Sequence, residues 1–280
     1  MGRAGPGTYA WHAAVDMTLH IFDPAVYGSG LSAGLFVAIL ICLAAGRWLG
    51  QRVHARAGGG AVASVGSLET SVFALLGLLI AFTFSGALTR FDTRRAQAVD
   101  EANAIGTAYL RVDLLPAAAQ PKVRDTFRAY TDARIATYRK LPDVAAAEKE
   151  LQQSLALQSE LWTQAVKASR QPGASPAAEL LLLPAVNAMF DITTVRIAAT
   201  QIHPPTIVYA MLVALSLAAA LLAGYQQAAE KDYDWMHKLG FAAITALTVY
   251  VILDIEHPRL GLVRIDAIDQ FLIDVRAGMK

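Results

Sequence analysis

The stretch Leu78–Arg95 reads LLIAFTFSGALTRFDTRR, and it contains the transition that decides the fold. Its first half is made of apolar and small hydroxyl residues, whereas its second half carries Arg90, Arg94 and Arg95. No proline and no cluster of turn-forming residues separates the two halves. We therefore predict a single helix that crosses a membrane and continues beyond it as a basic helix.

The composition of the whole chain favours a membrane protein. The 280 residues are 55% hydrophobic and only 17% charged, and the mean hydropathy is +0.40. This apolar excess is larger than a single soluble core requires. The net charge of +1 and the lack of a basic tail predict no nucleic-acid partner. Cys42 is the only cysteine, so the chain has no internal disulfide.

Four nearly uncharged runs approach the length of about 20 apolar residues that a spanning helix needs. Since hydrocarbon offers no hydrogen-bond partners, we expect each run to be helical. The predicted transmembrane helices are 30–49, 71–89, 205–229 and 239–256. The segments between and around them are an N-terminal segment 1–29, a glycine-rich loop 50–70, a soluble domain 90–204, a short loop 230–238 and a C-terminal tail 257–280.

Helical spacing of apolar residues runs through the soluble domain, and no alternation typical of strands interrupts it. Asp143 is a good N-cap for one of its helices. The predicted fold is therefore all-α: an integral membrane protein with four transmembrane helices and a helical soluble domain inserted between spans two and three. The helices expected in this domain are 90–114, 119–140, 144–170 and one that ends at 201 after starting at 177 or 184.

The second span carries the candidate pore. Ala74, Leu78 and Phe82 lie at positions i, i+4 and i+8, on one narrow face of the helix. Ser85 and Thr89 extend this face with hydroxyl groups towards the basic end. An apolar neck followed by a polar vestibule suits a passage for anions. The alternative is that this face packs against a neighbouring helix.

The basic half of the stretch Leu78–Arg95 has two interpretations. Arg90, Arg94 and Arg95 are predicted to line the vestibule with Ser85 and Thr89. Alternatively, they belong to a structural layer of ion pairs at the base of the soluble domain, since buried charges must be paired. We predict a structural charge network that contains Glu101 and Arg111, with Arg94 on the same face as Glu101 and Asp113 as a further candidate member.

The sequence contains no recognisable catalytic motif, and its six histidines are scattered. We therefore expect no enzymatic activity, no cofactor and no metal. Two alternatives remain at this stage. Asp254 and Glu256, beside His257 at the end of span four, are candidates for a cation site. Asp100, Glu101 and Asp254 are candidates for an enzyme that acts on lipid, if the fold gathers them in a pocket.

Four short motifs stand out: Phe82-Thr83-Phe84-Ser85, Arg90-Phe91-Asp92 with Arg94-Arg95, the block Glu101–Arg111, and Asp254 followed by His257-Pro258-Arg259 and Gly261. Together they closely resemble the bestrophin-like domain family, a large group of bacterial membrane proteins whose function is not settled. The resemblance covers roughly residues 30–275 and implies a multi-pass protein of the bacterial inner membrane. The charges give two answers on orientation. Arg47, Arg52 and Arg56 favour a cytoplasmic location for the loop after span one, whereas the larger number of arginines on the domain and tail side favours a cytoplasmic soluble domain, which we adopt.

The chain is more distantly similar to the bestrophin anion channels. That resemblance implies a pentameric homo-oligomer whose second span lines the pore, with Ala74, Leu78 and Phe82 at the neck. Two departures are visible: Phe91-Asp92 stands where bestrophins have paired tryptophans, and Ala74 is small for a neck residue. The acidic calcium clasp of animal bestrophins is not carried over to this chain.

The function expected from the sequence is passive conduction of small anions by a homo-oligomer in the lipid bilayer. The alternative is a non-conducting membrane scaffold or sensor whose helical domain binds a partner.

Overall fold

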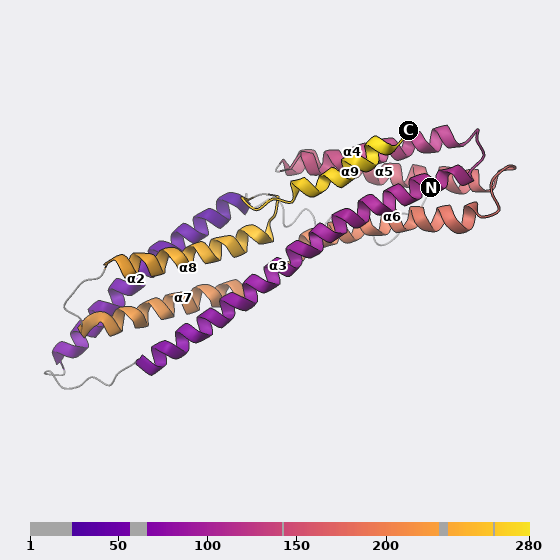
Figure 1. Cartoon of the computed structure of the whole chain (residues 1–280). Helices are drawn as coiled ribbons and strands as arrows, with labels where there is room; N and C mark the ends of the chain where they lie inside the picture. Colours follow the sequence, from indigo (N-terminus) through magenta and orange to yellow (C-terminus); the bar gives the residue numbers. More distant parts are fainter. Residues whose placement is uncertain (1–23, 57–65, 142, 230–234, 260) are drawn as a thin grey trace, which may run out of the picture. The chain divides into compact units, whose positions relative to one another are not determined.

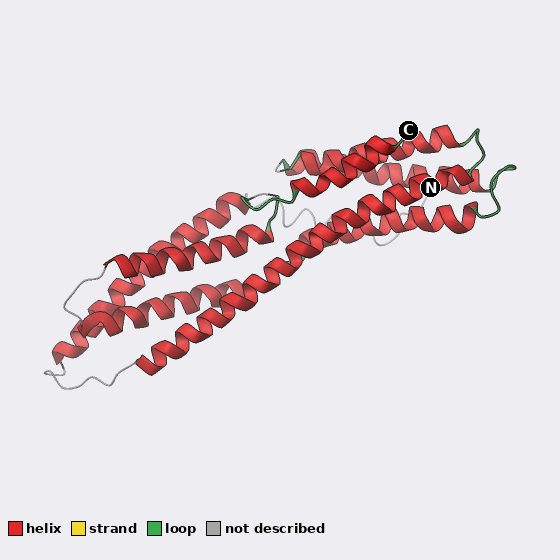
Figure 2. Cartoon of the chain, viewed as in Figure 1, coloured by secondary structure: helices red, strands yellow, loops and turns green. Residues whose placement is uncertain are grey.

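The computed structural model describes residues 24–56, 66–141, 143–229, 235–259 and 261–280. Within these ranges every regular element is a helix, as Figure 2 shows. The prediction of an all-α chain is confirmed for this part of the sequence. The predictions made for 1–23, 57–65 and 230–234 lie outside the described residues.

The structure contains four stretches that are long and apolar enough to cross a membrane. The first, second and fourth belong to α2 (Pro24–Arg56), α3 (Gly66–Leu110) and α8 (Trp235–Glu256). The third stretch is divided into α6 (Ala178–Gln201) and α7 (Thr206–Gln226). Pro204 and Pro205 lie at this division, where the missing N–H groups and the restricted backbone end the first helix.

The helices extend beyond the predicted spans. α2 begins at Pro24 and continues to Arg56, so the helix extends beyond both ends of the predicted span 30–49. α3 begins at Gly66 and α8 at Trp235, inside the segments predicted as loops. Hydropathy marks only where the apolar side chains end. The backbone continues as a helix until glycine or proline interrupts it.

The chain separates into two compact units. The first unit contains Met1–Thr89 and His203–His257. In it α2 packs along α7 and α8 (Figure 1). Close approach of α2 and α7 depends on glycine at two places: a Cβ atom on Gly46 would lie 2.0 Å from the Leu221 carbonyl oxygen, and one on Gly224 would lie 2.1 Å from that of Leu43. Small residues of this kind let the backbones of membrane helices touch.

The second unit contains Arg90–Ile202 and Pro258–Lys280. Its helices are the second part of α3, α4 (Gln120–Arg139), α5 (Val144–Ser169), α6 and α9 (Gln270–Gly278), with short 3-10 turns η1 (Arg111–Leu114) and η3 (Asp266–Asp269). These bounds agree with the helices predicted for 90–201. The predicted N-cap is confirmed, because Asp143 Oδ1 accepts a hydrogen bond of 3.0 Å from the Ala146 N–H. That this unit is soluble stays a prediction.

The C-terminal residues are part of the second unit rather than a separate tail. Leu272 is fully buried in its hydrophobic core. Arg276 forms a bidentate ion pair with Asp132 of α4, with N–O distances of 2.8 and 2.9 Å. At the very end, the Tyr109 hydroxyl donates to the Lys280 carbonyl oxygen. Sequence reasoning assigned no element to 257–280, and these long-range contacts explain why a helix forms there.

We predict that Gly46→Ala destabilises the protein, because the new methyl group collides with the backbone of α7. Overpacking of this kind costs about 1–3 kcal/mol. Gly34→Ala is the matched control on the same helix, since nothing lies within 4 Å of its added Cβ atom. That control should gain about 0.5–1 kcal/mol from helix propensity. Thermal unfolding in detergent measures both, and equal midpoints for the two variants would contradict the close contact.

Candidate functional site

The predicted pore residues share one uncovered face of α3. Phe82 is 68% exposed and Leu78 is 53% exposed, and Ala74, Ser85 and Thr89 are exposed as well. In the most apolar window of this helix only 17% of the residues are buried, against 44% for α8. The described part of the chain therefore leaves this face of α3 open to lipid, to solvent or to another copy of the protein.

The opposite side of α3 is buried along its length. Leu76, Ala87, Ala98 and Ile105 have at most 3% of their surface exposed. At about 100° per residue these positions fall on one stripe, across the helix axis from Phe82 and Leu78. Packing thus gives the helix one covered side and one open side, which the nearly uniform hydrophobicity of its first half does not reveal.

Helical register separates the three arginines that were predicted to line the vestibule. Arg94 follows Thr89 by five positions, so it points about 140° away from the open face. It is 8% exposed, and its guanidinium donates to the carbonyl oxygens of Ala199 and Ile202, each at 3.1 Å. Arg94 therefore lies in the buried stripe rather than on the open face. Arg90 and Arg95 flank the open face, half-buried and exposed respectively.

Continuing the open face beyond Thr89 leads to Asp92 rather than to an arginine. The side chain of Asp92 is 62% exposed, and its carboxylate accepts a hydrogen bond of 3.4 Å from Arg95. The polar end of this face consequently carries an acidic group between two basic ones. Its formal charge is +1 for each chain, counted over Arg90, Asp92 and Arg95.

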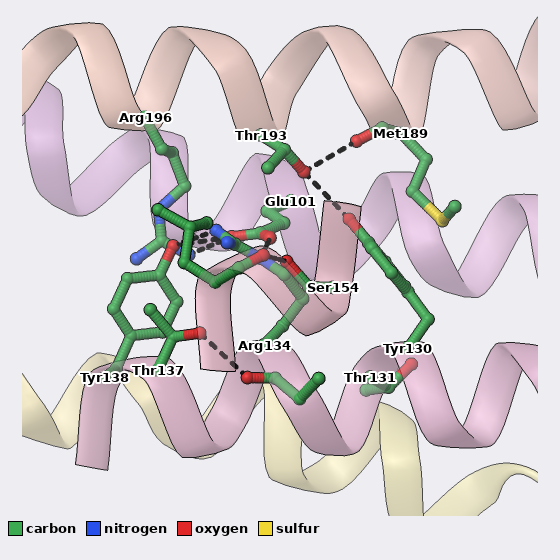
Figure 3. A network of polar contacts seen from close by, with 12 residues as sticks. Glu101, Tyr130, Thr131, Arg134, Thr137, Tyr138, Ser154, Met189, Thr193 and Arg196 are labelled. Carbon is green, nitrogen blue, oxygen red and sulfur yellow. Dashed lines mark hydrogen bonds and ion pairs between the residues drawn. The ribbon is translucent and has the colours of Figure 1, made fainter. Parts of the chain in front are cut away.

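A second cluster lies in the buried stripe, in the part of α3 that belongs to the second unit. Figure 3 shows Glu101 between Arg134 of α4 and Arg196 of α6. Arg134 Nε donates to Glu101 Oε1 at 2.6 Å, and Arg196 Nη1 pairs with Oε2. All three side chains are at least nine-tenths buried. One carboxylate thus holds two guanidinium groups in the interior of the unit.

Tyr138 completes this cluster. Its hydroxyl accepts a hydrogen bond from Arg134 and donates one of 3.3 Å to Glu101 Oε2. The guanidinium carbons of Arg134, Arg196 and Arg259 lie 5.1, 4.1 and 4.6 Å from the centre of its ring. These distances are within the range of cation–π attraction. Arg259 is itself held by a bidentate ion pair with Asp269, at 2.7 and 2.9 Å.

The electrostatics of the cluster follow from burial and from the unequal numbers of charges. Burial raises the pKa of the Glu101 carboxyl, but the Arg134 and Arg196 guanidinium groups outweigh this effect and lower that pKa to about 2. Burial also raises the pKa of Tyr130 to about 12. Tyr130 lies beside the cluster, where its hydroxyl is 2.8 Å from Thr193 Oγ1. Two guanidinium groups against one carboxylate leave the ionised cluster with one net positive charge.

These sites fall within a region shared with known proteins. The family model described as the bestrophin-like domain matches residues 37–268. This range is most of the chain, and it includes the open face of α3 and the Glu101 cluster. The chain belongs to the bestrophin-like family. Neither the curated proteins nor the solved structures include a significant match.

In this bestrophin-like chain the charge network predicted for Glu101 and Arg111 has a different composition. Glu101 is at its centre, but its partners come from α4 and α6. Arg111 instead donates to the Leu181 carbonyl oxygen at 2.6 Å. Sequence reasoning missed Arg134, Tyr138 and Arg196. The usable signal was Arg196, a single charge in the otherwise uncharged run from Ile192 to Gln201.

The remaining acidic candidates are those named above for a cation site and for an enzyme that acts on lipid. Asp254 and Glu256 are buried, at 7% and 1% exposure. The Tyr250 hydroxyl donates to Asp254 Oδ1 at 3.4 Å, and Glu256 Oε2 lies 3.5 Å from His203 Nδ1. Among the described residues, no group of three or more metal-ligating side chains is gathered. Asp100 is exposed on α3, next to the buried Glu101.

We predict that Glu101→Gln strongly destabilises the second unit, because it leaves two buried guanidinium groups without a counter-charge. Removing one partner of a buried ion pair costs about 3–5 kcal/mol. Asp100→Asn is the matched control, since this exposed neighbour should change stability by less than about 0.5 kcal/mol. Hydrogen exchange of peptides from α4 and α6 measures the effect. Unchanged protection in Glu101→Gln would show that the cluster does not hold these helices together.

Proposed function

We propose that this chain forms a homo-oligomeric channel that passes small anions passively, with α3 lining the pore. The observation that carries the proposal is the uncovered face of α3, on which Ala74, Leu78, Phe82, Ser85 and Thr89 are all exposed. This face changes from apolar to hydroxyl-bearing along the helix. Membership of the bestrophin-like family supports the proposal, through the more distant similarity to bestrophin channels.

The dimensions of the face suit a pore. From Ala74 to Thr89 it extends about 22 Å along the helix axis, a large part of the roughly 30 Å hydrocarbon thickness. Phe82 and Leu78 would form the narrow part. A constriction lined only by apolar side chains resists wetting, so it acts as a barrier that a change in radius opens or closes.

An oligomer is required because one helix face cannot enclose a passage. Copies arranged around a symmetry axis would bring the same face of each α3 to the centre. A pentamer is the arrangement that the similarity to bestrophins favours. The open face would then be covered by equivalent faces, which explains why a single chain leaves large apolar side chains exposed along it.

Selectivity for anions would come from the charged end of the open face of α3. Each chain contributes a net charge of +1 from Arg90, Asp92 and Arg95, and a ring of copies multiplies this charge around one opening. A concentrated charge of this kind raises the local concentration of counter-ions. Ser85 and Thr89 would offer hydroxyl groups to a partly dehydrated anion between this ring and the neck.

The proposed location is the bacterial inner membrane, with the helical second unit in the cytoplasm. In this arrangement the basic end of α3 faces the cytoplasm. The second candidate function is a non-conducting scaffold or sensor. It is favoured by Asp92, which places an acidic group on the face where an anion would enter.

We predict that the purified protein in a planar bilayer gives currents whose reversal potential follows the chloride gradient. Phe82→Ala should raise the single-channel conductance, because it widens and hydrates the neck. Phe84→Ala is the matched control: it removes the same side chain two positions away, on a different face of α3. A larger effect of Phe84→Ala than of Phe82→Ala would exclude the proposed lining. Silence from intact oligomers of all three proteins would favour the scaffold.

Charge substitutions at the mouth should change selectivity in opposite directions. Asp92→Asn removes the acidic group and should raise the permeability of chloride relative to potassium. Arg95→Gln removes a neighbouring positive charge and should lower it. The reversal potential under a tenfold KCl gradient measures both changes. Identical reversal potentials in the two variants would mean that this end of α3 does not border the ion path.

A further inference from the structure

The Glu101 cluster of the second unit contains more positive than negative charge. Arg134 and Arg196 both pair with Glu101. Arg259, the third arginine at the tyrosine ring of this cluster, pairs with Asp269 at N–O distances of 2.7 and 2.9 Å. Three guanidinium groups therefore face two carboxylates, which leaves an excess of one positive charge. Burying an excess charge is costly unless a counter-charge accompanies it.

The described neighbours of the cluster within the second unit do not remove this excess. Asp266 lies 3.5 Å from Arg259, but it also pairs with Arg264 at 2.6 Å, so Asp266 and Arg264 add one charge of each sign. The phenol of Tyr138 adds no negative charge, because burial raises the pKa of its hydroxyl above the ordinary range. Counted over these described residues, the excess remains one positive charge.

One donor of the cluster also lacks a protein acceptor. The Arg134 side chain is only 1% exposed; its Nε atom donates to Glu101, and one terminal nitrogen, Nη2, donates to the Tyr138 hydroxyl. The other terminal nitrogen, Nη1, is buried and has no hydrogen-bond partner in the part of the chain that the structure describes. Because a buried charged donor without an acceptor is strongly unfavourable, Nη1 marks a position for an additional acceptor.

The excess charge and the buried donor together define the chemistry of a ligand. A water molecule would accept a hydrogen bond from Arg134 Nη1 but would leave the excess charge in place. A monovalent anion accepts the hydrogen bond and also supplies the one negative charge that the cluster lacks. Because Nη1 is enclosed in the interior of the unit, a bulky organic anion could reach it only by displacing the surrounding core. The ligand that suits this position is therefore small.

We propose that the second unit binds one small monovalent anion, of the size of chloride, at Arg134 Nη1. The anion accepts a hydrogen bond from this guanidinium group and completes the charge balance of the cluster. The site lies on the buried side of α3 and does not depend on the proposed pore, since an anion held here stabilises the contact of α3 with α4 and α6. Because only the folded unit offers the site, the stability of this unit is linked to the anion concentration.

The test measures hydrogen exchange of the full-length protein in detergent micelles while sodium chloride replaces sodium gluconate at constant ionic strength. Gluconate is too large for the site, so the experiment changes only the supply of a small anion. Above the dissociation constant, the protection of α4 and α6 peptides should rise about tenfold for each tenfold increase in chloride, as expected when one ion is released on opening. Peptides from α2 and α7 of the first unit are the internal control and should not respond.

Arg196→Gln tests the charge balance, because it leaves one guanidinium group against Glu101 and removes the excess charge. The chloride dependence of the α4 peptides should then disappear, whatever their protection in gluconate. Arg139→Gln is the matched control, since it removes an exposed arginine of α4 and should keep the chloride dependence of the wild type.

Three results would overturn the proposal. The first is protection of the wild type that does not change with chloride, which would assign a water molecule to Arg134 Nη1. The second is an equal response of the α2 and α7 peptides, which would mean a general effect of the salt. The third is equal chloride dependence in Arg196→Gln and Arg139→Gln. The first two results come from the wild type alone, so they decide the question even if Arg196→Gln fails to fold.

Discussion

The carboxylate of Glu101 joins three helices of the second unit, because its two oxygens pair with Arg134 of α4 and Arg196 of α6. Burying these charges is favourable only if they are paired and hydrogen-bonded. The pairing therefore sets which side of α3 faces inwards in this unit. Tyr138 and Arg259 add to the same cluster, so the segment after α8 depends on it as well.

Each unit buries one side of its own part of α3. In the first unit Leu76 and Ala87 are buried, whereas Phe82 and Leu78 are left uncovered by the described residues. In the second unit Arg94 and Glu101 are buried. Within each unit the helical period therefore separates buried structural residues from the exposed side of the helix.

In the first unit, close backbone packing at glycines joins the helices, whereas buried ion pairs join them in the second unit. Gly46 and Gly224 allow the backbones of α2 and α7 to touch. Arg47, next to one of these glycines, lines a cavity between α2 and α8. In a membrane, small residues bring helices together, and basic residues at the helix ends meet the headgroups.

The sequence by itself determined the all-helical class, the four apolar stretches, the Asp143 cap and the face shared by Ala74, Leu78 and Phe82. Each of these depends on composition, length or spacing along one helix. Only the tertiary structure decided that Arg94 is buried, that Glu101 pairs with Arg134 and Arg196 rather than Arg111, and that residues after 257 pack on the second unit. The physical reason is that a buried charge is neutralised by whichever partner the fold brings within a few ångströms, and such partners lie far apart in the sequence.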